Sequence, residues 1–129
     1  MAKEELVADF KTFVRTLEET AGPVALLMLM PVEPGTEQAW TLLVSARTFD
    51  GQSQRESIKE IVSQLNSSLS DTVRPWVKRV SILKSDDPFV RAMNSTIHAE
   101  HSTIDMASAI VGGVEIPRAI VFESKRTAA

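Results

Sequence analysis

The chain has 129 residues, of which 43% are hydrophobic and 24% charged, the length and composition of one globular domain. It contains no cysteine, which excludes disulfide bonds, thiol nucleophiles, iron–sulfur clusters and cysteine-ligated zinc. The formal net charge is −3, and the densest basic segment, residues 74–79, holds only three positive charges, so nucleic acid is not an expected partner.

The sequence carries no recognisable membrane or export signal. Its first ten residues are acidic and amphipathic, whereas a signal peptide has a basic start and an apolar core. The longest apolar run, residues 24–30, has seven residues, far fewer than the ~20 that span a bilayer. We therefore expect a cytoplasmic protein that does not contact membranes.

The first part of the sequence predicts a helix and two strands. Apolar residues recur at helical spacing from Leu6 to Leu17, and Gly22–Pro23 end that helix. The run 24–30 predicts a strand buried on both faces, and a turn rich in proline leads to a second strand over 39–46. In this second strand alternate residues should face opposite sides of the sheet.

The middle of the sequence predicts a helix, a strand and another helix. Residues 53–56, Ser-Gln-Arg-Glu, form a capping box that starts the first of these helices. A third strand is expected over 76–83. Asp87 as N-cap, followed by Pro88, then begins a helix, and the side chains expected to face the core are Phe89, Met93 and Ile97.

Two structures are compatible with residues 102–111. Ser102 can cap a helix with Asp105 three residues later, or the segment can be a strand that turns through Gly112–Gly113 into a hairpin. The alanines and the cap favour the helix. Pro117 places the final strand at a sheet edge or delays its start to about Arg118, and residues 124–129 are expected to form a frayed tail.

Together these elements predict one α+β domain over residues 1–129. Its order is helix, strand, strand, helix, strand, helix, an element of either type, and strand. The first two strands should run antiparallel, whereas the second and third, joined through a helix, should run parallel by a right-handed crossover. We therefore expect a mixed sheet of four or five strands with helices packed on it.

The two histidines, His98 and His101, stand three residues apart in the segment STIHAEHSTID. With a nearby carboxylate they could bind a divalent metal ion. Their spacing differs from the zincin pattern, where the histidines are four apart and a glutamate follows the first. A polar connection between two elements is the interpretation that we prefer.

A second candidate site lies where the second strand ends, at Ser45, Arg47 and Asp50. In a parallel crossover unit, ligands favour the carboxyl ends of strands. Arg47 could hold an anion there, and Asp50 could accept a proton or bind a metal. Alternatively, Asp50–Gly51 forms a turn in which Asp50 bonds to its own backbone, and Arg47 is simply exposed.

The order helix, strand, strand, helix, strand, together with Ser45–Arg47, resembles the small nucleotidyltransferases, whose strand end reads Gly-Ser-x-x-Arg. In that family two carboxylates spaced Asp-x-Asp on the next strand hold metal ions. This chain lacks both the preceding glycine and that pair of carboxylates, since Asp86–Asp87 stand at a helix start. The resemblance therefore implies the topology and not the catalysis.

The sequence contains no phosphate-binding loop, dinucleotide fingerprint or nucleophile elbow. It thus carries no recognisable catalytic signature, and we expect no cofactor. The leading hypothesis is a non-enzymatic module that binds itself or another protein through an edge strand. Trp76 beside Arg74 suits such an interface, or it is a core residue. The alternative is a small enzyme or ligand sensor for a nucleotide, anion or divalent metal, in which Arg47, Asp50 and a histidine converge.

Overall fold

The computed structural model describes residues 2–33, 35, 38–100 and 102–126. Its elements, in chain order, are α1 (Ala2–Ala21), β1 (Val24–Pro31), β2 (Trp40–Ala46), α2 (Arg47–Asp50), α3 (Gln54–Ser68), the 3-10 turn η1 (Arg74–Trp76), β3 (Val77–Ile82), α4 (Pro88–Thr96), β4 (Ile104–Val111) and β5 (Val114–Ser124). None of the helices in these ranges is long and apolar enough to cross a bilayer.

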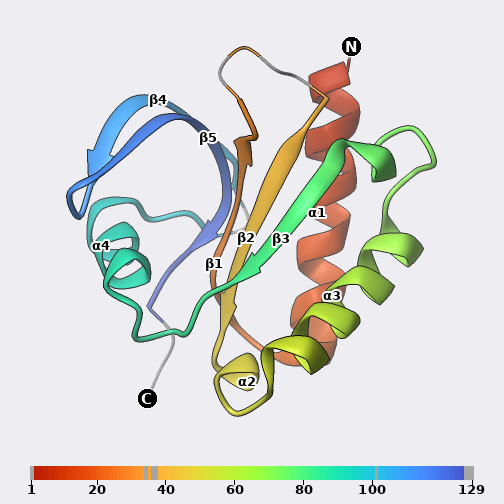
Figure 1. Cartoon of the computed structure of the whole chain (residues 1–129), viewed down its shortest axis with the longest axis horizontal. Helices are drawn as coiled ribbons and strands as arrows, with labels where there is room; N and C mark the ends of the chain where they lie inside the picture. Colours follow the sequence, from red (N-terminus) through yellow and green to blue (C-terminus); the bar gives the residue numbers. More distant parts are fainter. Residues whose placement is uncertain (1, 34, 36–37, 101, 127–129) are drawn as a thin grey trace.

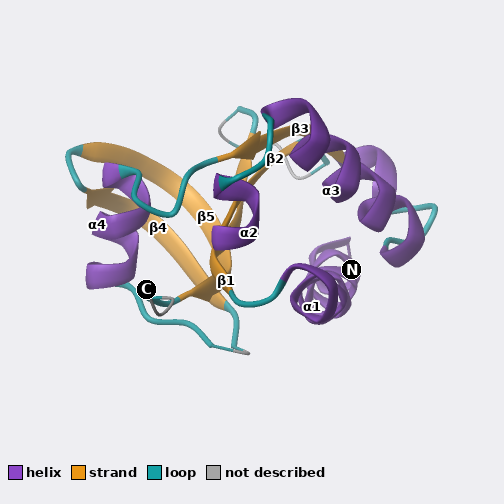
Figure 2. Cartoon of the chain, turned by 90° about the horizontal axis from the view of Figure 1, so that it is seen from below, coloured by secondary structure: helices purple, strands orange, loops and turns teal. Residues whose placement is uncertain are grey.

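The strands form one mixed sheet in the order β3-β2-β1-β5-β4 (Figure 1). β1 and β2 are antiparallel, β2 and β3 are parallel, and β5 runs antiparallel to both β1 and β4. Helices lie on both sides of the sheet (Figure 2), with α1 and α3 on one face and α4 on the other. The prediction of an α+β domain with a mixed sheet is confirmed.

Two capping residues start their helices as the sequence predicts. The Ser53 side chain accepts a hydrogen bond from the Glu56 backbone N–H at 3.2 Å. Asp87 accepts one from Phe89 N–H at 2.8 Å, with Pro88 in the first helical turn. Each cap satisfies one of the backbone donors that a helix start leaves without an internal partner, so both starts are set locally.

Two apolar cores lie on opposite faces of the sheet. The first fills the space between the sheet and the helices α1 and α3, and it includes Phe10, Phe13, Leu17, Ile61 and Leu65. The second lies under α4 and includes Val90, Met93, Ile116 and Val121. The predicted alternation in β2 is confirmed, because Trp40, Leu42, Val44 and Ala46 join the first core while Leu43 joins the second.

The helix favoured over residues 102–111 is wrong, and the alternative hairpin is right. β4 pairs with β5 from Ile104 opposite Val121 to Val111 opposite Val114. Gly112 and Gly113 make the turn with φ of 58° and 80°, a conformation that glycine adopts without strain. Pairing with β5 and burial against α4 outweigh the helical preference of the alanines, because strand formation depends mainly on such tertiary contacts.

Pro117 lies inside β5, so the later start near Arg118 is wrong, whereas the edge position holds only locally, on the side of β5 that faces β1. β5 begins at Val114 and lies between β1 and β4. The proline is accommodated because β1 pairs with β5 only from Ile120 onward. On the β4 side it stands beside the irregularity at Ser108, whose φ is 54°, and prolines within sheets concentrate at such irregular positions.

Residues 124 and 125, expected to belong to a frayed tail, are instead held by hydrogen bonds. Ser124 is fully buried, and it exchanges two backbone hydrogen bonds with Ala99, at 2.8 and 3.0 Å. The backbone N–H of Lys125 donates to Ala25 O at 3.0 Å. Residues 127–129 lie outside the described ranges.

A charged cluster joins the end of β5 to α1. Lys125 Nζ lies 3.0 Å from Glu18 Oε2 and 3.1 Å from Glu123 Oε2, and Glu123 is fully buried. Burial lowers the pKa of Lys125, but hydrogen bonds and charge attraction from Glu18 and Glu123 outweigh it and raise the pKa above 10.5. The ammonium group is therefore more stable in the folded protein than in the unfolded chain.

A methyl group added at Gly112 should destabilise the protein more than one added at Gly113. Both positions have positive φ, which costs alanine about 1 kcal/mol. At Gly112 the new Cβ would also lie 2.8 Å from Ala92 Cβ in α4, whereas at Gly113 it would meet nothing within 4 Å. Overpacking adds about 1–3 kcal/mol, so chemical denaturation should show a larger loss for Gly112→Ala. Equal losses would contradict the contact between the hairpin and α4.

Lys125→Met should lower the free energy of unfolding by about 3 kcal/mol, because it removes the ammonium from a buried carboxylate. Glu100→Gln is the control: Glu100 lies 3.8 Å from Lys125 Nζ and is 52% exposed, so its loss should cost less than about 1 kcal/mol.

The same cluster predicts a pH dependence. Since the pKa of Lys125 is raised above 10.5, its contribution is complete below that pH and is lost as the pH rises through the folded pKa. Melting temperatures measured from pH 9 upward should therefore fall more steeply for the wild type than for Lys125→Met. Parallel curves would show that the ion pair does not contribute.

Candidate functional site

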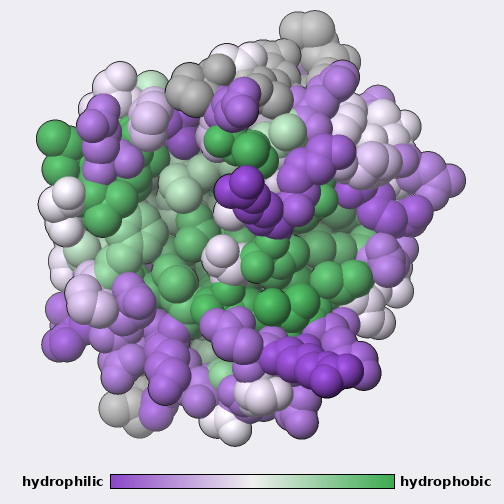
Figure 3. Space-filling view, viewed as in Figure 1, coloured by the Kyte–Doolittle hydropathy of each residue, from purple (hydrophilic) through white to green (hydrophobic). Residues whose placement is uncertain are grey.

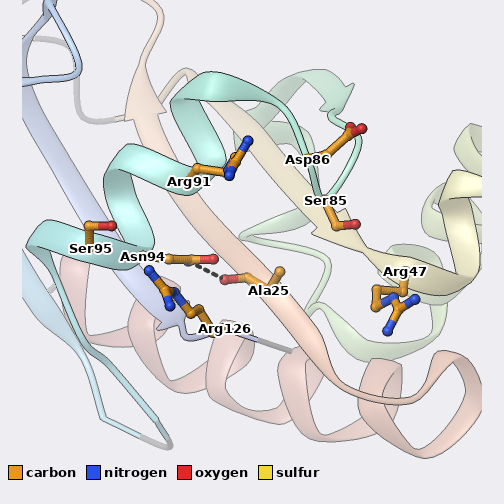
Figure 4. A pocket seen from close by; sticks show the side chains of 8 residues that line it. All are labelled: Ala25, Arg47, Ser85, Asp86, Arg91, Asn94, Ser95 and Arg126. Atoms are coloured by element: carbon orange, nitrogen blue, oxygen red, sulfur yellow. Dashed lines mark hydrogen bonds between the residues drawn. The ribbon is translucent and has the colours of Figure 1, made fainter. Parts of the chain in front are cut away.

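A cavity of about 570 Å³ opens where β2 and β3 end. Because these strands are parallel, their carboxyl ends meet at one edge of the sheet, the place where ligands bind in many α/β proteins. The cavity is lined mainly by the polar side chains of Arg47, Ser85, Asp86, Arg91, Asn94 and Arg126 (Figure 4). Ser95 and the small side chain of Ala25 complete the lining.

Three arginines from separate parts of the chain make the cavity basic. Arg47 belongs to α2, Arg91 to α4, and Arg126 follows β5. In Figure 4, Arg47 lies across the cavity from Arg91 and Arg126. Within the described part of the chain, the guanidinium groups of Arg91 and Arg126 make no hydrogen bond or ion pair, and Asp86 is the one acidic residue among the lining residues. Such a concave surface of mainly one charge attracts anions.

Asn94 positions α4 over the cavity. Its side-chain Nδ2 donates to Ala25 O at 2.9 Å, which Figure 4 shows as a dashed line. It also lies 3.2 Å from Ser124 Oγ, so one amide ties α4 to both β1 and β5. Arg91 precedes Asn94 by three residues and therefore shares its helical face, which places Arg91 at the cavity.

Asp50 holds the loop between β3 and α4 in place. Its carboxylate accepts hydrogen bonds from the Ser85 backbone N–H at 2.9 Å and from the Ser85 hydroxyl. The expectation that Asp50 bonds to its own turn is therefore wrong. Asp50 is not among the lining residues; it acts through Ser85, whose hydroxyl donates its hydrogen bond to Asp50 and keeps lone pairs that can accept a further one.

The structure brings only part of the predicted site residues together. Arg47 lines the cavity and Asp50 supports its wall. Ser45 is fully buried, with no hydrogen-bond partner for its hydroxyl among the described residues. His98 is exposed after α4 and does not line the cavity, and His101 lies outside the described residues. Over the described ranges, no three histidine, aspartate or glutamate side chains are grouped to hold a metal.

Sequence reasoning missed Arg91, Asn94 and Arg126. The spacing of Arg91 and Asn94 on the polar side of a predicted helix was a usable signal, since residues three apart share a face. No feature of the neighbouring sequence indicated a role for Arg126, because residues 124–129 are predicted to form a tail. Its place depends on where β5 lies in the sheet.

Asp50→Ala should destabilise the protein by about 1–3 kcal/mol, because it leaves the Ser85 backbone N–H without its acceptor. Asp86→Ala is the matched control one residue further along the loop, since Asp86 is exposed and makes no hydrogen bond within the described ranges. Urea denaturation of both variants measures the difference. Similar losses would show that Asp50 does not hold the loop.

Comparison with known proteins supplies no relative. The chain matches no protein-family model, no curated protein and no solved structure.

Proposed function

We propose that this protein is a binding module for a small organic phosphate, held in the basic cavity at the ends of β2 and β3. The observation that carries the proposal is the convergence of Arg47, Arg91 and Arg126 on one cavity. A guanidinium group presents its donors in a planar fork that matches two phosphate oxygens. Positive charges that lie around one cavity repel one another, and a bound anion reduces this repulsion.

The other lining groups suit the organic part of such a ligand. Ser85 and Asp86 present acceptor oxygens, while Asn94 and Ser95 lie on the α4 side. Acceptor oxygens beside a phosphate site can receive hydrogen bonds from the hydroxyl groups of the ligand. The volume of about 570 Å³ lies within the range of small-molecule sites, roughly 300–1,000 Å³. A sugar phosphate or a nucleoside monophosphate combines these features.

The proposal is for binding and not for catalysis. A reaction that breaks a phosphate bond at neutral pH usually employs a general base with a pKa near 7, most often histidine. The eight residues that line the cavity include no histidine and no lysine. Ligand binding alone thus accounts for the groups that are present.

Melting temperatures in chloride buffer should rise with inorganic phosphate, glucose 6-phosphate or AMP, and glucose should have no effect. A ligand at 100 times its dissociation constant adds ~2.7 kcal/mol, which is several degrees for a domain of this size. Arg91→Gln and Arg126→Gln should each weaken binding at least about tenfold, because each removes a charge-assisted hydrogen bond.

Arg55→Gln is the control, since Arg55 is an exposed arginine of α3 that does not line the cavity. It should leave the shift unchanged. The proposal fails if none of the phosphates stabilises the wild type at 10 mM, or if the shift survives in the double variant of Arg91 and Arg126.

A further inference from the structure

A second surface, the β3–α3 groove, lies apart from the phosphate cavity. It is a depression of about 300 Å³ between β3 and α3, and its apolar floor contains Ile58, Val62, Leu65, Val77 and Val80. Figure 3, seen from the same side as Figure 1, shows hydrophobic side chains gathered in the area between β3 and α3. Val62 is 40% exposed, so the groove presents apolar surface to solvent.

The backbone of β3 is open along the same groove. β3 is at the edge of the sheet and pairs with β2 on one side. No other described strand pairs with its second side, so outward N–H and C=O groups are available. An edge strand beside an apolar groove is the geometry in which an extended peptide adds to a sheet, with alternate side chains entering the groove.

The charged residues that line the groove indicate the charge of the partner that would fit it. Its lining includes Arg74, Lys78 and Arg79 and no acidic residue. Lys78 and Arg79 are exposed, and their side chains make no hydrogen bond or ion pair within the described residues. Arg74 is already engaged by Asp71 at 2.9 Å, which leaves Lys78 and Arg79 for a partner. Acidic side chains would complement them.

A second copy of this chain fits the groove poorly. Antiparallel pairing of two β3 strands would bring Lys78 and Arg79 close to the same residues of the other copy, and like charges opposite each other destabilise a sheet. The register shift between β2 and β3 also leaves Lys78 without a counterpart, since Val77 pairs with Trp40 and Arg79 with Thr41. The bulge and Lys78 at the free edge of β3 therefore disfavour pairing of this edge with a second copy of the chain.

We propose that an extended acidic segment of another protein adds as a strand to the free edge of β3. Its apolar side chains occupy the β3–α3 groove, and its carboxylates pair with Lys78 and Arg79. This docking surface is independent of the phosphate cavity, because the two share no lining residue.

The test uses two synthetic eight-residue peptides with blocked ends, four Glu-Val repeats and four Lys-Val repeats, added to the isotope-labelled full chain. NMR amide shifts should locate the Glu-Val peptide at β3 and α3, and the Lys-Val peptide should not bind. The double variant Lys78→Glu, Arg79→Glu should lose at least about tenfold in affinity for Glu-Val and gain affinity for Lys-Val.

Lys84→Glu is the matched control, because Lys84 is an exposed basic residue after β3 that does not line the groove. It should leave binding unchanged. Methylating alternate amide nitrogens of the Glu-Val peptide should abolish binding, since strand addition requires main-chain hydrogen bonds.

Three results would overturn the proposal. The first is no binding of Glu-Val at millimolar concentration. The second is shifts confined to the phosphate cavity, as for a peptide that binds only as an anion. The third is a wild-type dimer, seen by light scattering, that Val62→Asp converts to monomer, because the groove would then belong to a second copy of the chain.

Discussion

The arrangement of this protein depends on one strand that is apolar on both faces. β1 carries seven consecutive hydrophobic residues, and its first six are buried. Such a strand is stable only with cover on both sides and with a hydrogen-bonded strand along each edge. α1 and α3 cover one face, and α4 covers the other. β2 and β5 supply the flanking strands, so β1 organises the whole domain.

The basic cavity follows from this arrangement. α4 packs against β1, β4 and β5, while α2 follows the end of β2; the cavity lies between these two helices, with Arg47 on one side and Arg91 on the other (Figure 4). Both sides are fixed by partly buried hydrogen bonds, from Asn94 to Ala25 and from Ser85 to Asp50. The arginines are thus carried by anchored backbone, which reduces the ordering cost of binding an anion.

The charge distribution explains how an acidic protein can present two basic surfaces. The net charge is −3, yet the cavity and the β3–α3 groove contain six basic residues and one acidic residue between them. On α1 acidic residues predominate, since Glu4, Glu5, Asp9, Glu18 and Glu19 outnumber Lys3, Lys11 and Arg15. The local charge of these two surfaces thus differs in sign from the net charge of the chain, and a local excess of positive charge favours anions.

The sequence by itself determined the local elements: α1, α3 and α4 follow from apolar spacing and from the caps Ser53 and Asp87, and β1 and β2 follow from apolar runs between turn residues. These signals act over a few residues, so they need no knowledge of the fold. Only the tertiary structure decided that β4 is a strand, that Pro117 lies inside β5, and that Arg126 joins Arg47 at one cavity. The reason is that β5 inserts between β1 and β4. Its pairing with β1 joins segments that are distant in the chain, and such pairing depends on packing that no short stretch of sequence encodes.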